Sequence, residues 1–310
     1  MKNFIIITLL FMAVSTQAAP QGRDGFSGNI DIGMFGMNST DALMATVSNE
    51  DIDTLSDNPD SFSRIKPIVT SELRYKKGDI LYHAGTPPTD ATPQFLLGTT
   101  FLYGKSSVDL SVILAPFGKV WKDPYVSDRK STRDSSAGLR LKMENISGTR
   151  FGAKIQMISH DIDNDAIGRR FSDMKRNGET YSFTGDYKQP LSQHSVITPF
   201  VTYTIEDRNG DAMSGQGLQA GFKYLHKLKY GLIIPSFSIA GMWYNEDDSV
   251  FDKTRTDTTT SAFLMYKYFN PFGLANTHIN FLVGGSLRSS NIDFYDARTV
   301  FTGVTFGYDF

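Results

Sequence analysis

The chain of 310 residues contains no cysteine. This absence excludes disulfide bonds, catalysis by a thiol and metal sites with cysteine ligands. An excess of one charge sign is missing as well, because the formal net charge is −2 at neutral pH. Removal of the first 18 residues, which carry the single charged residue Lys2, would make it −3. A charge so close to balance argues against a protein that binds nucleic acid.

Long hydrophobic runs are also missing. Beyond residue 18 there is no stretch of ~20 apolar residues, so the sequence predicts no helix that spans a bilayer. The mean hydropathy of −0.25 and the hydrophobic content of 40% would suit a soluble protein. They also suit a transmembrane β-barrel, in which only every second residue of a strand meets lipid. Composition alone therefore leaves both classes open.

The N-terminus has the three parts of a secretory signal peptide. Lys2 is positively charged, residues 4–14 are apolar, and residues 16–18 form a small-residue cleavage pattern. We expect cleavage after Ala18, because cleavage one residue later would leave a proline at the new N-terminus. A membrane anchor is disfavoured, since so short an apolar segment cannot cross ~30 Å of hydrocarbon as a helix. The mature chain would be residues 19–310.

After the signal, segments of roughly ten residues with alternating polarity recur. In residues 137–144, Ala137, Leu139, Leu141 and Met143 alternate with Gly138, Arg140, Lys142 and Glu144. The connections between such segments are short and long in strict alternation. Short periplasmic turns and longer extracellular loops are typical of outer-membrane barrels, whereas a soluble β-sandwich or propeller rarely sorts its loops in this way.

Counting these segments predicts an all-β fold, a transmembrane antiparallel up-and-down β-barrel of about 14 strands. Residues 29–35 and 65–76 are expected to be the first two strands, on either side of a long polar loop. Residues 79–84 would form a strand shorter than the ~9–11 residues that a crossing needs. The alternative is a barrel of 12 strands, with residues 19–64 as a periplasmic arm or a plug in the lumen.

The last strand ends on an aromatic residue. Its apolar face consists of Val300, Thr302, Val304, Phe306, Tyr308 and Phe310. This ending resembles the C-terminal strand of bacterial outer-membrane barrels, which the barrel-assembly machinery recognises. The resemblance implies an assembly signal made of Val304, Phe306, Tyr308 and Phe310, with periplasmic chaperones as further partners during biogenesis. It also implies a place in the bacterial outer membrane, in contact with lipid and lipopolysaccharide.

The interior side of the predicted strands carries more basic than acidic residues. The basic ones are Arg74, Lys76, Arg140, Lys142, Lys154, Lys188, Lys223, Lys267 and Arg288. The acidic ones are Asp31, Glu72, Asp109, Glu144, Asp186 and Asp309. Rings of charge set ion selectivity, and 14 strands enclose more space than their side chains fill. The pattern therefore predicts a porin-like passive pore for small hydrophilic solutes, with a slight preference for anions. The alternative is a non-conducting structural or adhesion barrel.

Two other kinds of site are weaker in the sequence. Residues 161–165 place aspartates at alternate positions, as a calcium loop does, but Ala166 and Ser172 stand where the EF-hand pattern needs Gly and Glu. His160 beside Asp161 would suit an envelope hydrolase at the extracellular rim. No nucleophile motif accompanies any histidine, however. We therefore predict no catalytic residue, no metal and no cofactor.

Three short segments and the terminal residue carry a family resemblance. They are residues 26–30 (Phe-Ser-Gly-Asn-Ile), residues 72–75 (Glu-Leu-Arg-Tyr), residues 81–87 (Leu-Tyr-His-Ala-Gly-Thr-Pro) and the terminal Phe310. Together they resemble a gammaproteobacterial outer-membrane family that is known as a domain of unknown function. The resemblance implies a small channel-like barrel. It implies no substrate and supplies no catalytic residues.

Overall fold

The computed structural model describes residues 24–52, 54–55, 60–86 and 94–310, so the predicted signal peptide lies outside the described residues. These residues form one antiparallel sheet. Its strands are β1 (Gly25–Ser39), β2 (Phe62–Lys77), β3 (Ile80–Gly85), β4 (Phe95–Tyr103), β5 (Ser106–Trp121), β6 (Ser131–Glu144), β7 (Phe151–Ile162), β8 (Gly178–Tyr187), β9 (Gln189–Pro190), β10 (Ser195–Arg208), β11 (Gly215–Leu228), β12 (Gly231–Asp248), β13 (Lys253–Phe269), β14 (Thr277–Ser290) and β15 (Ala297–Asp309).

The sheet closes on itself, because β1 pairs with β2 on one side and with β15 on the other. The two-residue β9 pairs with β10 beside the turn that follows β8, and β8 itself is the neighbour of β10. The ring therefore has 14 strands, as predicted. The 12-stranded alternative is wrong, since β1 is a full member of the wall. Closure pairs the first strand with the last, so neither of them is left as an open edge in hydrocarbon.

The two faces of the wall differ as the alternation predicts. On β15, Val300, Val304 and Phe306 are exposed on the outside, whereas Thr299 and Thr305 are buried on the inside. Apolar side chains cover the exterior of the other strands in the same way. An apolar exterior around a closed ring places the protein in the bacterial outer membrane. Among the described residues, no helix is long and apolar enough to cross a membrane.

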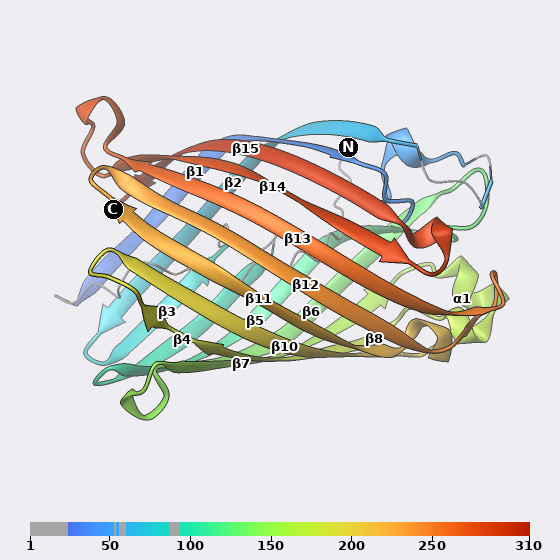
Figure 1. Ribbon diagram of the computed structural model, residues 1–310, viewed down its shortest axis with the longest axis horizontal. Helices are drawn as coiled ribbons and strands as arrows, with labels where there is room; N and C mark the ends of the chain where they lie inside the picture. Colours follow the sequence, from blue (N-terminus) through green and yellow to red (C-terminus); the bar gives the residue numbers. More distant parts are fainter. Residues whose placement is uncertain (1–23, 53, 56–59, 87–93) are drawn as a thin grey trace.

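The two ends of the barrel also differ (Figure 1). The end at which β1 begins and β15 finishes has short connections, including the 3-10 turns η2 (Ile146–Gly148) and η5 (Pro271–Gly273). We call it the turn end. The opposite loop end carries α1 (Ala166–Arg170) and the 3-10 turns η1 (Val47–Asn49), η3 (Ser172–Met174), η4 (Asp211–Met213) and η6 (Asp293–Tyr295). We assign the loop end to the cell exterior from the usual distribution of loop lengths.

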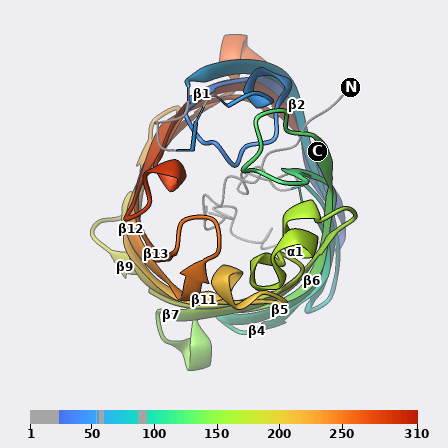
Figure 2. The same ribbon diagram turned by 90° about the vertical axis from the view of Figure 1, so that its right-hand side faces the viewer.

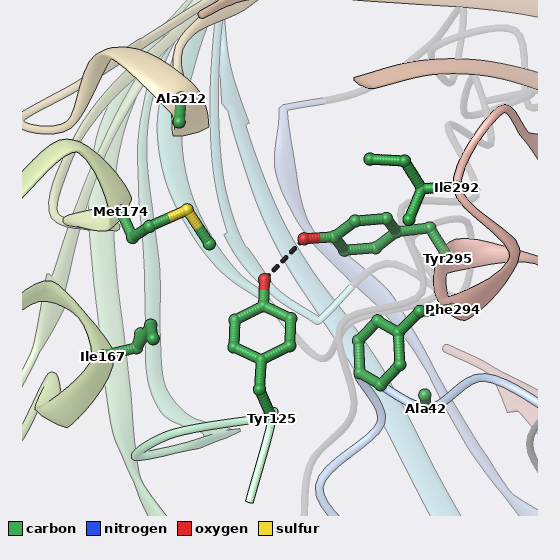
Figure 3. Close-up of a cluster of buried hydrophobic side chains, with 8 residues drawn as sticks. All are labelled: Ala42, Tyr125, Ile167, Met174, Ala212, Ile292, Phe294 and Tyr295. Atoms are coloured by element: carbon green, nitrogen blue, oxygen red, sulfur yellow. Dashed lines mark hydrogen bonds between the residues drawn. The ribbon is translucent and has the colours of Figure 1, made fainter. Parts of the chain in front are cut away.

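The loops of the loop end fold inward over the mouth of the ring (Figure 2). They meet in a buried apolar group, the loop cluster, to which η6 and α1 contribute (Figure 3). Its buried members are Ala42, Tyr125, Ile167, Met174, Ala212, Ile292, Phe294 and Tyr295. The Tyr125 and Tyr295 hydroxyls form a hydrogen bond of 2.5 Å, and Tyr295 donates to Asp248 at the end of β12. Burial raises the pKa of both tyrosines, so both are neutral at physiological pH.

Candidate functional site: the charged interior of the barrel

Most of the interior charges predicted from the sequence lie in the part of each strand nearest the turn end. Lys142 and Glu144 are at the end of β6, and Lys154 is near the start of β7. The strand register links them, because Lys142 is paired with Asp109 on one side and with Lys154 on the other. We call this set the charged belt. Its members are Asp31, Glu72, Arg74, Lys76, His83, Asp109, Arg140, Lys142, Glu144, Lys154, Asp186, Lys188, Lys223, Lys267, His278 and Asp309.

One cluster of the belt surrounds Asp109 on β5. The carboxylate lies 2.5 Å from His83 Nε2 and accepts hydrogen bonds from Ser111 (2.6 Å) and Thr100 (2.9 Å). The guanidinium of Arg140 donates to it at 3.1 Å. A buried carboxylate with this many donors is held as an anion in one position. The cluster therefore fixes Arg140 and His83 against the wall.

A second cluster joins β6 to the turn that follows β8. Lys142 Nζ lies 2.5 Å from one oxygen of Glu144, and Lys188 Nζ lies 3.2 Å from the other. One carboxylate is therefore shared by two ammonium groups, and this part of the belt keeps a positive excess.

A third cluster lies across the belt on β14, β15 and β1. His278 is fully buried, with its Nε2 at 2.8 Å from Asp31 and its Nδ1 at 3.2 Å from Asp309. Lys267 Nζ is 3.9 Å from Asp309. Gly307 lies between these groups, and a Cβ there would stand 2.1 Å from His278 Nε2 and 2.5 Å from Asp31 Oδ1. The missing side chain leaves room for the hydrogen bond.

Positive and negative charges are unevenly distributed around the belt. The arc from β6 to β11 contains five basic residues, Arg140, Lys142, Lys154, Lys188 and Lys223, against the acidic Glu144 and Asp186. The remaining arc, on β13 to β15 and β1 to β5, contains three basic residues, Arg74, Lys76 and Lys267, against the acidic Asp31, Glu72, Asp109 and Asp309. A solute in the lumen would thus lie between a basic and a slightly acidic wall. Such a field acts strongly inside low-dielectric walls.

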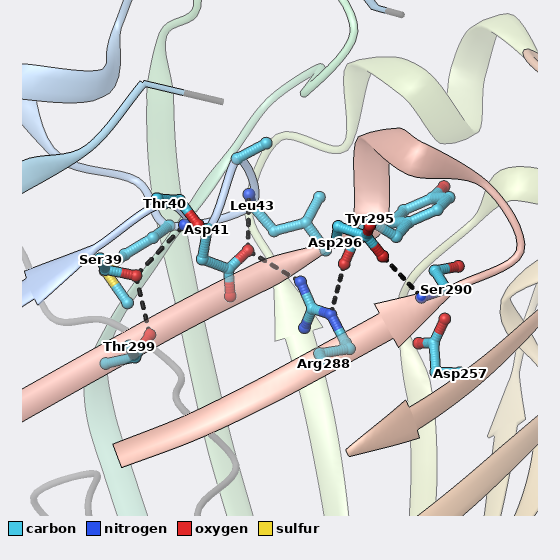
Figure 4. A network of polar contacts seen from close by, with 12 residues as sticks. Ser39, Thr40, Asp41, Leu43, Asp257, Arg288, Ser290, Tyr295, Asp296 and Thr299 are labelled. Carbon is cyan, nitrogen blue, oxygen red and sulfur yellow. Dashed lines mark hydrogen bonds and ion pairs between the residues drawn. The ribbon is translucent and has the colours of Figure 1, made fainter. Parts of the chain in front are cut away.

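Arg288 is the one predicted interior residue that lies away from the belt. It is near the loop end of β14, where its guanidinium donates to Asp41 (2.9 Å) and to the Tyr295 carbonyl (2.7 Å) (Figure 4). The arginine therefore connects the first loop and η6 to the wall. Its place indicates that it holds the loops rather than lines the belt.

The sequence prediction missed other interior charges near the loop end. Arg255 pairs with Asp257 at 2.5 Å, and the Arg255 guanidinium lies 3.6 Å from the centre of the Tyr295 ring. Arg208 pairs with Glu206 on β10. In each pair the two charged residues are two positions apart, as residues on one face of a strand are. This spacing was the only signal in the sequence that could have found them.

The aspartates of the calcium-like segment, residues 161–165, lie close to arginines. Asp163 pairs with Arg133 (3.1 Å) and Asp165 pairs with Arg176 (2.7 Å), so these carboxylates are neutralised by arginines. In the described part of the chain no group of three or more acidic or histidine side chains is arranged to hold a metal.

His160 and Asp161 do not form a pair in the structure. Adjacent residues of a strand point to opposite faces, and the carboxylate nearest to His160 is Asp134, at 3.8 Å. A serine–histidine contact does occur elsewhere, between Ser195 Oγ and His226 Nδ1 (2.7 Å). The Tyr224 hydroxyl contacts the same Nδ1 atom, at 3.4 Å, and so does not orient the ring from the opposite nitrogen. A nucleophile would need a base oriented by a third group, and a tyrosine hydroxyl supplies no such charge.

The closed ring, the apolar exterior and the charged interior define an integral β-barrel protein of the bacterial outer membrane. The chain belongs to a protein family of unknown function, DUF2860, whose model matches residues 25–309. The family resemblance read from the sequence is thereby confirmed. No curated protein matches the chain.

Several solved structures are similar to this chain. An anion-selective porin from Comamonas acidovorans is 8% identical with a TM-score of 0.43, and the match covers 93% of this chain and 99% of that one. A bacterial polysaccharide outer membrane secretin is 11% identical with a TM-score of 0.43, covering 91% and 98%. The outer membrane channel DcaP of Acinetobacter baumannii is 10% identical with a TM-score of 0.42, covering 92% and 98%.

Proposed function

We propose that the protein is a passive, water-filled pore for small hydrophilic solutes that favours anions. The observation that carries the proposal is the basic arc from β6 to β11, where five basic residues face two acidic ones. An ion pair neutralises its own members and leaves little field at a distance. Arg140 is paired with Asp109 of the other arc, so this arc retains an excess of two basic residues, which a passing anion would meet.

The size of the ring supports an aqueous lumen. Barrels of about 8 strands are just wide enough for their own side chains, and barrels of about 16 strands leave a channel. With 14 strands this ring lies close to the second case. The interior wall also carries small hydroxyl side chains, among them Thr184, which is 2.9 Å from Thr202, and Ser238, which is 3.0 Å from Gln219. Side chains of this size leave the middle of the barrel to water.

The loop cluster favours a second candidate, a barrel that does not conduct. Its apolar members come from loops that start on different sides of the ring, and their contacts narrow the mouth. In the proposed pore the loops restrict the size of the solute. In the alternative they seal the mouth and leave a structural barrel.

Ion selectivity tests the proposal. The reversal potential of the refolded protein is measured in a planar bilayer under a salt gradient, for the wild type and for the double variant Lys154→Glu, Lys223→Glu. These changes reverse two charges of the basic arc and leave the ion pairs of Arg140 and Lys142 in place. We expect anion preference in the wild type and a shift towards cations in the variant. An unchanged reversal potential would contradict the proposal.

The matched control is the double variant Lys130→Glu, Lys253→Glu. It makes the same change of charge at exposed side chains of the loop end, away from the belt. Salt screens such exposed charges within ~10 Å at 0.1 M. The control should therefore retain the reversal potential of the wild type.

A further inference from the structure

One stretch of the interior wall is aromatic where the wall around it is polar. The strand register places Phe263, Gly284, Phe301, Met37 and Arg64 in a single row across five neighbouring strands. In the adjacent row, Gly303 is followed by Phe35 and Lys66. We call Phe35, Met37, Phe263 and Phe301 the aromatic patch. It lies between the charged belt and the loop cluster.

The rings of the patch lie against one another and along the wall. The Phe35 and Phe301 rings are stacked, with centroids 5.6 Å apart and an angle of 24° between their planes. The Phe263 ring is 6.0 Å from the Phe301 ring. A Cβ at Gly284 would stand 2.7 Å from the Cζ atom of Phe301, so the glycine provides the space in which this ring lies. The Phe35 and Phe263 rings are half-buried, so part of each faces the lumen.

Two cations border the patch on β2. Arg64 and Lys66 are two residues apart on the interior face, and Lys66 Nζ lies 5.5 Å from the centre of the Phe35 ring. Arg64 has no ion pair with a carboxylate among the described residues, and its buried Nη1 has no hydrogen-bond partner there. A buried donor without an acceptor is costly and is rarely kept without a reason. An anion between the two cations would satisfy it.

We infer that the aromatic patch, with Arg64 and Lys66, is a binding site for an amphipathic carboxylate, that is, a molecule with an aromatic ring and a carboxylate group. The inference deepens the proposed function and rests on it for the access of the ligand to the lumen. The ring of the ligand lies on Phe35 and Phe263, where aromatic surfaces favour offset stacking. Its carboxylate accepts a hydrogen bond from Arg64 Nη1, and Lys66 supplies the second positive charge. A small inorganic anion has no ring that could stack on Phe35 and should bind less well.

Binding is tested on the full mature chain refolded in detergent, by titration calorimetry with benzoate. Acetate has the carboxylate without the ring, and benzyl alcohol has the ring without the charge. We expect benzoate to bind at least ten times more tightly than either. Equal affinity of benzoate and acetate would overturn the inference, and so would the absence of measurable benzoate binding to folded protein.

Two variants assign the binding to the patch. Arg64→Gln should weaken benzoate binding about tenfold, because a hydrogen bond to a charged group is lost. Phe35→Leu should weaken it several-fold. The controls are Arg133→Gln, which changes an exposed arginine at the loop end, and Phe281→Leu, which changes a ring on the lipid face of β14. Equal losses in variants and controls would overturn the assignment.

Conductance separates this inference from the proposed function. A folded protein that binds benzoate and does not conduct would refute the pore and retain the site. A protein that conducts and binds benzoate no better than acetate would refute the site and retain the pore.

Discussion

Leu139 offers a direct test of which face of the wall meets lipid. It lies near the middle of β6, and 56% of its surface is exposed on the outside of the ring. An arginine on the lipid face near the midplane destabilises a transmembrane barrel by about 2–4 kcal/mol. Since 1.36 kcal/mol corresponds to a factor of ten, Leu139→Arg should raise the equilibrium constant for unfolding by roughly 30- to 900-fold.

The assay is reversible urea unfolding of the protein in lipid vesicles. Trp243, which is exposed on the outside of β12, reports the loss of the lipid environment through its fluorescence. The control is Lys142→Arg on the same strand. Its side chain faces the interior beside Glu144 and retains its charge, so its free energy of unfolding should be almost unchanged. Equal losses in the two variants would refute the assigned faces of β6.

Three further outcomes are expected. The backbone of Phe310 pairs with Gly28 of β1, so deletion of Phe310 should reduce the folded fraction in the membrane, measured by heat-modifiable migration in gels. Deletion of Phe272, which is exposed in a turn, should leave the folded fraction unchanged. Gly307→Ala should cost about 1–3 kcal/mol of stability in urea unfolding by separating His278 from Asp31, and Gly185→Ala, where a Cβ meets no atom within 4 Å, should be nearly neutral. The pKa values of Tyr125 and Tyr295 are raised in the folded protein. The resulting stabilisation is complete below the unfolded pKa of about 10 and is lost as the pH rises above it. Spectrophotometric titration should therefore show two fewer late-ionising tyrosines in the variant Tyr125→Phe, Tyr295→Phe than in the wild type.

The membrane-spanning part of the fold could be predicted because lipid imposes a rule on it. Every second residue of a strand must be apolar there, and segments such as residues 137–144 repeat that pattern. The alternation therefore predicted both the strand number and the faces. The predicted short strand after residue 78 is also present, as β3 (Ile80–Gly85).

The ends of the strands could not be predicted by the same rule. Residues 116–136 and 245–257 resemble long polar connections in the sequence, yet β5 extends to Trp121, β6 begins at Ser131 and β13 begins at Lys253. These parts extend beyond the apolar layer, so their outward residues are polar, as Arg133, Thr254 and Thr256 show. Where a strand does not contact lipid, both of its faces can be polar, so apolar and polar residues no longer alternate. The interior residues Arg255 and Asp257 were missed for that reason.

The loop cluster and the aromatic patch could not be predicted from local pattern at all. Tyr125 and Tyr295 are 170 positions apart in the chain and meet only because the ring brings their loops together. Phe301 is a buried aromatic residue on the interior face of β15. Its contact with Phe35 depends on the pairing of the first strand with the last.

The central claim is that the barrel encloses a continuous aqueous path. Single-channel recording of the refolded wild-type mature chain in a planar bilayer tests it most directly, with folding verified by heat-modifiable migration. We expect discrete conductance steps with a reversal potential on the anion side. Folded protein that gives no current above that of a protein-free bilayer would contradict the claim, and the loop cluster would then be the seal of a structural barrel.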